Sequence, residues 1–167
     1  PDIGVEQTVT LGPGERRELT FDPGRFAALE LDRPDLWWPY TLGDPALYDL
    51  KLEFWQRDHV IDSTSTRFGV RTFRQHRDSD ERFPGSGGNF YLTVNGRDFP
   101  VRGAVYTPDL LFRDDPGRED ATLAYTRDLG LNMLRLESKI PGERFFARAD
   151  ELGIPLMVGW MCCNQWE

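Results

Sequence analysis

The sequence predicts a chain of mixed β and α/β class, with an antiparallel β-sandwich followed by a parallel sheet and its helices. In the first part, apolar and polar residues alternate between glycine- and proline-rich turns, which is typical of half-buried strands. In the second part, segments with helical spacing alternate with short apolar strands that have no polar face. This second pattern indicates parallel strands that are buried on both sides.

The clearest strand is predicted over residues 47–54, because its apolar side chains all fall on one side: Tyr48, Leu50, Leu52 and Phe54. Shorter segments of the same kind predict four more strands, separated by Gly-Pro-Gly, Asp-Pro-Gly and Arg-Pro-Asp turns, at residues 5–11, 17–21, 28–31 and 66–73. An immunoglobulin-like sandwich uses roughly seven strands. This domain is therefore expected to begin before Pro1.

Residues 77–89 are predicted to be a linker between two domains, over residues 1–76 and 90–167. The stretch RDSDERFPGSGG is polar, charged and rich in glycine, and it lacks the lysine and hydroxyl residue that close a phosphate-binding loop. After it, Asn95 and Gly96 stand between two alternating apolar runs. That dipeptide favours a tight hairpin turn, so a hairpin is expected to open the second domain.

Two helices are predicted in the second domain. The first is capped by Asp115, begins at Pro116 and ends at Gly130, and its inner stripe is expected to be Leu123, Ala124 and Leu129. The second begins at Pro141 and ends at Gly153, with an inner face of Phe145, Phe146, Ala149 and Leu152. Parallel strands are expected before, between and after these helices, at residues 101–105, 131–136 and 154–160.

Functional residues of parallel βα folds lie at the carboxyl ends of the strands. This rule predicts one rim that contains Tyr106, Asp109, Arg135, Glu137, Ser138, Trp160, Asn164, Trp166 and Glu167. Other charged residues are expected to have no special role. Asp114, Asp115, Glu119 and Asp120 fit the electrostatics of a helix start, and Arg71, Arg74 and Arg77 are expected to be solvated.

Composition and charge exclude several classes of partner and site. With 28 acidic and 20 basic residues, the formal charge of −8 would repel a nucleic acid. No stretch is long and apolar enough for a membrane span, and no signal peptide is apparent, although a secreted location is favoured over the cytoplasm. Cys162 and Cys163 are adjacent and have no histidine at zinc-ligand spacing, so burial is expected for them, with no disulfide, metal or other cofactor.

Four segments, in this order and spacing, resemble glycoside hydrolase family 2 over essentially the whole chain: LWWPYTLGDPALYDL, FGVRTF, FYLTVNGRDFPVRGAVYTPD and DLGLNMLRLE. The stretches VRGAVYTPDLLF and GWMCCNQWE are most similar to the branch that contains exo-β-D-glucosaminidases, which remove glucosamine from the non-reducing end of chitosan. A β-mannosidase-like branch and β-galactosidase-like relatives remain as alternatives, as does a non-catalytic carbohydrate-binding module. The βα pattern counts against the last of these.

The resemblance implies a specific architecture and mechanism. The chain would contain part of an immunoglobulin-like sandwich, followed by the first three βα units of a (β/α)₈ TIM barrel. Enzymes of the family are retaining, with one carboxyl group as acid and base and a second as nucleophile. Those two groups follow the fourth and seventh barrel strands. They are therefore expected beyond Glu167, so that this segment alone is inactive and needs the remainder of the same polypeptide.

The resemblance also implies a substrate-binding role for several rim residues. Arg135 matches a family arginine on the second strand, where it would orient the nucleophilic carboxylate, with a core salt bridge as the alternative. Glu137 or Glu167 could accept hydrogen bonds from sugar hydroxyls or face a substrate ammonium, with a solvated or structurally paired carboxylate as the alternative for both. Asp109 is expected to bind substrate. Trp160 and Trp166 offer flat apolar surfaces to a pyranose ring, although Trp160 could belong to the barrel core. Met161 departs from the branch, which carries an acidic residue there, so a neutral sugar is also possible.

Overall fold

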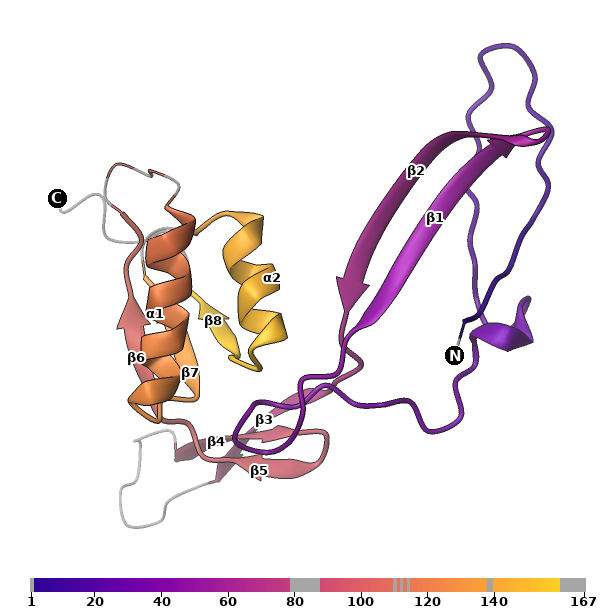
Figure 1. Ribbon diagram of the computed structural model, residues 1–167. Helices are drawn as coiled ribbons and strands as arrows, with labels where there is room; N and C mark the ends of the chain where they lie inside the picture. The colour runs from indigo at the N-terminus through magenta and orange to yellow at the C-terminus, as the bar shows by residue number, and fades with distance from the viewer. Residues whose placement is uncertain are drawn as a thin grey trace, which may run out of the picture. The chain divides into compact units, whose positions relative to one another are not determined.

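The computed structural model describes residues 2–78, 88–109, 111, 113, 115–137 and 140–159. The chain divides into two compact units, Pro1–Pro34 and Asp35–Glu167. Figure 1 shows the helices and strands of both units.

The first unit differs from the sequence prediction. The strands expected over 5–11, 17–21 and 28–31 do not form, and the described residues of this unit contain one short 3-10 helix, η1 (Ala27–Leu29). A strand requires a neighbouring strand to satisfy its backbone N–H and C=O groups. An alternating pattern shows which face of a segment could be buried, but it does not supply that neighbour.

The strand predicted at residues 47–54 is confirmed as β1 (Tyr48–Gln56), which pairs antiparallel with β2 (His59–Phe68). The strand predicted over 66–73 is wrong in its extent, because β2 ends at Phe68 and Phe73 begins the next strand. Gly69 marks the break. A Cβ atom on Gly69 would lie 2.6 Å from the Cβ of Trp37, so the backbone passes directly over that ring.

Trp37 is the largest of the fully buried side chains among the described residues, with 1% of its surface exposed. Its indole Nε1 donates a hydrogen bond to the backbone oxygen of Asp150, at 2.8 Å. Arg71 lies over the indole ring, 4.3 Å from its centroid, and forms an ion pair with Asp150 at 3.1 Å. Arg71 is exposed, as expected, and it also covers a buried aromatic ring.

Tyr40 joins the ends of the two αβ units. Its backbone N–H donates to the oxygen of Gly153 at 2.9 Å, and its hydroxyl donates to the oxygen of Leu131, also at 2.9 Å. These two carbonyl groups lie in the matching sequences DLGLN and ELGIP, which follow the two helices. One residue thus binds both αβ loops, the loop of Gly153 through its backbone and the loop of Leu131 through its side chain, and the stretch LWWPY supports the parallel sheet.

One antiparallel sheet contains strands from before and after the predicted linker: β3 (Phe73–Asp78), β4 (Asn89–Val94) and β5 (Arg97–Phe99). Asp78 pairs with Asn89, so the first two residues and the last residue of the linker predicted over 77–89 belong to strands. The remaining residues connect two adjacent strands of one sheet. The Asn95–Gly96 turn is confirmed, with φ angles of 48° and 79°.

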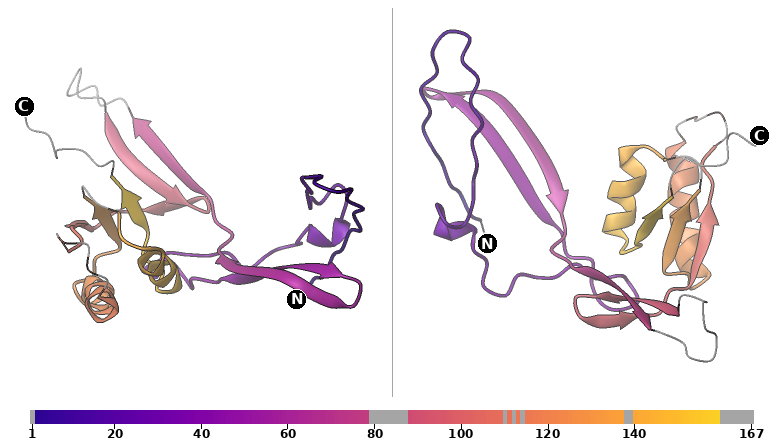
Figure 2. Two further views of the ribbon diagram at one scale, coloured as in Figure 1. Left: turned by 90° about the horizontal axis from the view of Figure 1, so that it is seen from above. Right: turned by 180° about the vertical axis from the view of Figure 1, so that it is seen from behind.

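The expected parallel sheet is confirmed, with the order β6 (Gly103–Tyr106), β7 (Met133–Leu136) and β8 (Leu156–Val158). Helices α1 (Pro116–Asp128) and α2 (Glu143–Glu151) connect these strands and lie on the same face of the sheet (Figure 2). Asp115 caps α1 by accepting a hydrogen bond from the Arg118 N–H, as predicted. No helix among the described residues is long and apolar enough to cross a membrane.

The core of this sheet lies between its strands and the two helices. Its buried members come from α1, β7, α2 and the loop between α2 and β8: Leu123, Leu134, Leu136, Phe145, Ala149 and Ile154. The inner face predicted for α2 is confirmed for Phe145 and Ala149. On α1 only Leu123 follows the prediction, since Ala124 and Leu129 are exposed and Thr126 is buried in their place. Thr126 is accommodated because its hydroxyl donates to the Thr122 oxygen at 2.8 Å.

Candidate functional site

The face of the parallel sheet opposite the helices carries a row of three aligned side chains. Val105 pairs with Arg135, and Arg135 pairs with Met157, so one residue from each strand lies at the same level. These positions are 61%, 53% and 40% exposed, respectively. Leu134 and Leu136 point to the helices, and Arg135 between them therefore points away. This places a cation between two apolar side chains.

Arg135 and Glu137 form an ion pair near the carboxyl end of β7. The Nε atom of Arg135 lies 3.1 Å from Oε2 of Glu137, whose side chain is 30% exposed. The backbone N–H of Glu137 donates to the oxygen of Tyr106 at 3.1 Å, which extends the β6–β7 ladder by one residue. Two of the predicted rim residues are thus held together by the sheet itself.

Gly159 allows the chain to pass close to this pair. Its N–H donates to the oxygen of Leu136 at 3.0 Å. A Cβ atom on Gly159 would lie 2.6 Å from that same oxygen and 3.9 Å from Nε of Arg135. Sequence reasoning did not single out Gly159, although a glycine that directly follows an apolar strand indicates a close backbone approach.

Asp109 follows β6 and organises its own loop. Its Oδ1 accepts a hydrogen bond from the Leu111 N–H at 2.8 Å, and its Oδ2 lies 2.7 Å from Nη2 of Arg113 and 3.3 Å from Nη1 of Arg118. Both carboxylate oxygens therefore have partners. The structure joins Asp109 to these arginines, and in the described residues it makes no contact with Arg135 or Glu137. The spacing Asp109 to Arg113 could have revealed this pair from sequence.

Asp109 also lines a pocket of about 130 Å³ between the end of β6 and the starts of the two helices. Tyr106 forms one wall of this pocket, where its ring stacks on Phe145 with the centroids 4.8 Å apart. Desolvation raises the pKa of the Tyr106 hydroxyl, and the negative charge of Glu119 raises this pKa to a smaller extent. Tyr106 therefore stays protonated near neutral pH and can donate a hydrogen bond.

The surroundings of Asp109 make a pH-dependent contribution to stability. Hydrogen bonds from the Arg113 side chain, and then from the Leu111 backbone, hold the pKa of the Asp109 carboxyl well below its usual range. A lowered folded-state pKa stabilises the fold above the unfolded-state value of about 3.9, and this contribution declines as the pH falls toward the folded-state pKa.

We expect the variant D109N to unfold at a lower urea concentration than the wild type near pH 7, because the charged partner of Arg113 is lost. The difference between the two midpoints should shrink steadily between pH 4 and pH 2.5. Urea unfolding followed by circular dichroism across this range measures it, with D49N on the exposed strand β1 as the matched carboxylate control. A difference that grows on acidification would contradict the assignment.

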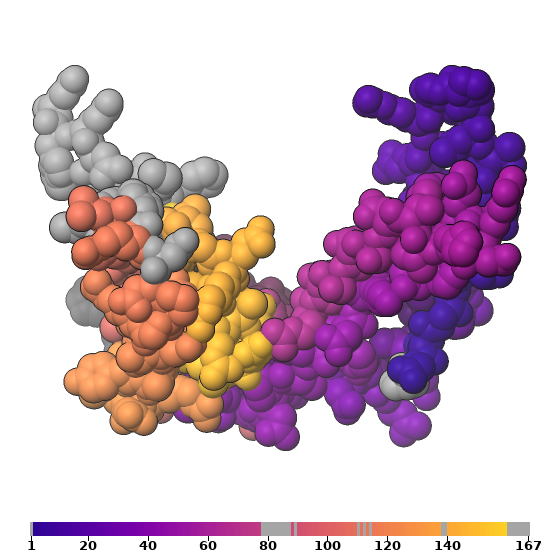
Figure 3. Space-filling model, turned by 45° about the horizontal axis from the view of Figure 1, so that its top comes forward, coloured from indigo at the N-terminus to yellow at the C-terminus, as the bar shows by residue number. Residues whose placement is uncertain are grey.

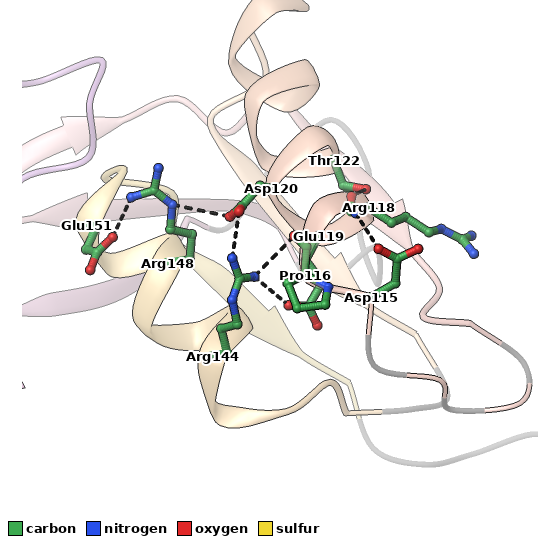
Figure 4. A network of polar contacts seen from close by, with 9 residues as sticks. All are labelled: Asp115, Pro116, Arg118, Glu119, Asp120, Thr122, Arg144, Arg148 and Glu151. Carbon is green, nitrogen blue, oxygen red and sulfur yellow. Dashed lines mark hydrogen bonds and ion pairs between the residues drawn. The ribbon is translucent and has the colours of Figure 1, made fainter.

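Ion pairs connect the outer surfaces of the two helices. Arg144 of α2 binds Glu119 at 2.9 Å and Asp120 at 2.6 Å, and Arg148 lies 3.3 Å from Asp120 (Figure 4). Figure 3 shows the surfaces of α1 in orange and α2 in yellow directly against each other. Glu119 and Asp120 therefore act across the helix pair as well as at the helix start, and this network is structural.

The remaining predicted site residues lie outside the described residues: Ser138, Trp160, Asn164, Trp166 and Glu167, together with Met161, Cys162 and Cys163. Their roles stay predictions. In the part of the chain that the structure describes, no group of three or more histidine, cysteine or acidic side chains could hold a metal ion.

Comparison with known proteins gives consistent matches. Residues 3–71 match the family Glycosyl hydrolases family 2. The exo-β-D-glucosaminidase of Amycolatopsis orientalis is 39% identical over 163 residues, which is 98% of this chain and 15% of the relative. The enzyme of the same name from Streptomyces avermitilis is 37% identical over 96% of this chain and 17% of its own length. β-Mannosidase B of Aspergillus flavus is 33% identical over only 47% of this chain and 9% of the relative.

Solved structures agree with these sequence matches. The crystal structure of Amycolatopsis orientalis exo-chitosanase CsxA has a TM-score of 0.70 and 38% identity, over 81% of this chain and 15% of that one. The β-glucuronidase of Parabacteroides merdae, at 22% identity and a TM-score of 0.61 over 75% of this chain and 14% of its own, shares the fold. The chain spans about a sixth of the length of the relatives it matches across nearly all of its own residues. It belongs to glycoside hydrolase family 2.

Proposed function

We propose that this chain is a segment of a retaining exo-β-glycosidase that removes terminal β-linked glucosamine from chitosan-type oligosaccharides. One observation carries this choice of sugar. The similarity to exo-β-D-glucosaminidases extends over 98% of the chain at 39% identity, whereas the similarity to a β-mannosidase covers 47% of the chain at 33%.

In this proposal, residues 1–76 belong to an immunoglobulin-like sandwich and residues 90–167 begin a (β/α)₈ barrel. The parallel order β6-β7-β8 supports the barrel, because both helices cover one face of the sheet and leave the other for a barrel interior. The family match over residues 3–71 supports a single domain that includes the hairpin β1-β2. The strands at the edges of this partial sheet require the remainder of the polypeptide to pair with them.

Arg135 is proposed to lie in the substrate-binding site. Its guanidinium points away from the helices at the carboxyl end of β7, where a catalytic carboxylate from the remainder of the polypeptide could accept a charge-assisted hydrogen bond. Trp160, Trp166 and Glu167 are proposed to form the adjacent wall. The two catalytic carboxyl groups are proposed to lie outside this segment, which then hydrolyses nothing by itself.

A β-mannosidase-type activity is the second candidate. Met161 favours it, because a neutral side chain at that position removes a carboxylate that could attract the ammonium group of glucosamine. The shorter match to β-mannosidase B is consistent with this alternative. A binding module without catalysis has less support, since the described residues contain three parallel strands with connecting helices.

The proposal is tested by incubating this 167-residue chain and the full-length product of its gene with chitosan oligosaccharides and with β-mannosides. Free glucosamine or mannose is quantified by chromatography. We expect glucosamine from the full-length product and no sugar from the segment. Mannose without glucosamine would select the second candidate. Hydrolysis by the segment alone would refute the proposed positions of the catalytic carboxyl groups.

A further inference from the structure

We propose that Glu137 is a positioning residue that holds the guanidinium of Arg135 and does not itself bind sugar. This inference rests on the proposed function and narrows it, because the sequence offered Glu137 as a sugar-binding carboxylate. The contacts of the Glu137 carboxylate distinguish a positioning role from a sugar-binding role.

The ion pair is built by the backbone of β7. Arg135 and Glu137 are two positions apart, so an extended strand directs both side chains to the same face. The N–H of Glu137 is fixed to the Tyr106 oxygen at 3.1 Å, which continues the ladder past the end of the strand. Glu137 Oε2 then lies 3.1 Å from Arg135 Nε. The contact follows from the strand geometry and needs no ligand.

The neighbours of Arg135 leave Glu137 as its charged partner among the described residues. Val105 and Met157, which are aligned with Arg135 on either side, carry no charge. Gly159 approaches the guanidinium without a side chain, since a Cβ there would lie 3.9 Å from Nε. Glu137 is also the less exposed member of the pair, at 30% against 53%. It therefore lies beside the arginine, and the arginine extends further toward solvent.

The chemistry of the guanidinium gives this contact a consequence. The planar group carries five N–H donors, of which Nε supplies one and the terminal nitrogens supply four. With Nε beside the Glu137 carboxylate, the four N–H donors of Nη1 and Nη2 are left for an incoming carboxylate or sugar oxygen. An arginine without this contact would distribute over several rotamers, and that side-chain entropy would be lost again when substrate binds.

We expect E137A in the full-length product to lower kcat for glucosamine release by about 10- to 100-fold, with KM changed less than about threefold, because a catalytic group is misplaced while the sugar contacts remain. The double variant R135A/E137A should be no slower than R135A, since Glu137 acts only through Arg135. E137Q should recover part of the loss, because its amide oxygen can take the place of the carboxylate oxygen beside Nε. E143Q, an exposed position at the start of α2, is the control and should match the wild type.

Two kinetic results would overturn the inference: a higher KM with unchanged kcat in E137A, which would indicate a sugar contact, or losses that multiply in the double variant. A second measurement does not depend on activity. In the ¹⁵N-labelled 167-residue chain, the Nε–H signal of Arg135, assigned by its loss in R135K, should exchange slowly with water. It should exchange faster in E137A and be unchanged in E143Q.

An Nε–H signal unaffected by E137A would also refute the contact. If the full-length wild type releases neither sugar, the proposed function fails, and the exchange measurement still decides whether Glu137 holds Arg135. If sugar is released and the double variant shows multiplied losses, the positioning role fails and the proposed function stands.

Discussion

Replacing Trp37 by alanine is expected to lower the unfolding free energy of the unit Asp35–Glu167 by about 3–5 kcal/mol, the range for truncating a large buried aromatic side chain. Trp37 is 1% exposed, so removal of its ring would leave a cavity enclosed by the surrounding core residues. The same change removes the Nε1 hydrogen bond to the Asp150 oxygen and uncovers Arg71, which lies over the ring. These losses affect the end of α2, which Asp150 occupies.

Two further variants separate the contributions at this position. W37F keeps most of the ring volume but loses the indole N–H, so we expect a loss of about 1–2 kcal/mol from the missing hydrogen bond to the Asp150 oxygen and the smaller ring. W55A is the matched control, because Trp55 is the same residue type and is 54% exposed on β1. It should cost less than about 1 kcal/mol. Urea unfolding followed by far-ultraviolet circular dichroism measures all three, and equal losses in W37A and W55A would contradict the burial argument.

The sequence predicted best the features that are decided by neighbouring residues. The Asn95–Gly96 turn and the Asp115 cap each depend on contacts within a few positions, and both appear as expected. The role of Arg71 was not predicted, because its partner Asp150 is distant in sequence. Trp37 and Asp150 are themselves 113 positions apart. The strands expected over 5–11, 17–21 and 28–31 also depend on partners that an alternating pattern does not identify.

The candidate site follows the same rule. Arg135 and Glu137 were predicted to share a rim because both end one strand, and the structure places them in contact. The engagement of Asp109 with two arginines was missed, because residue-by-residue reasoning gave its carboxylate to the substrate without asking which cations lie in its own loop. Gly159 was missed because its role is to leave space, and side-chain chemistry does not indicate that.

The substitution G153A is expected to cost about 2–5 kcal/mol, because two separate penalties act at this residue. Gly153 has a φ of +67°, in the left-handed region, where a side chain costs roughly 1–2 kcal/mol. A Cβ atom would also lie 2.7 Å from the backbone nitrogen of Tyr40 and 3.1 Å from the oxygen of Trp38. Neither backbone atom can move freely, since Tyr40 N–H donates to the Gly153 oxygen at 2.9 Å.

Gly130 provides a control within the same chain. It follows α1 as Gly153 follows α2, has the same φ of +67°, and has no atom within 4 Å of the position of a Cβ. G130A should therefore lose only the conformational term, about 1–2 kcal/mol. The difference in unfolding free energy between the two variants measures the energetic effect of the close approach of the Trp38–Tyr40 backbone to the end of α2. Hydrogen exchange of the Tyr40 amide should accelerate more in G153A than in G130A. Equal losses in stability and equal exchange would show that this backbone does not rest on Gly153, and the LWWPY stretch would then not fix the end of α2.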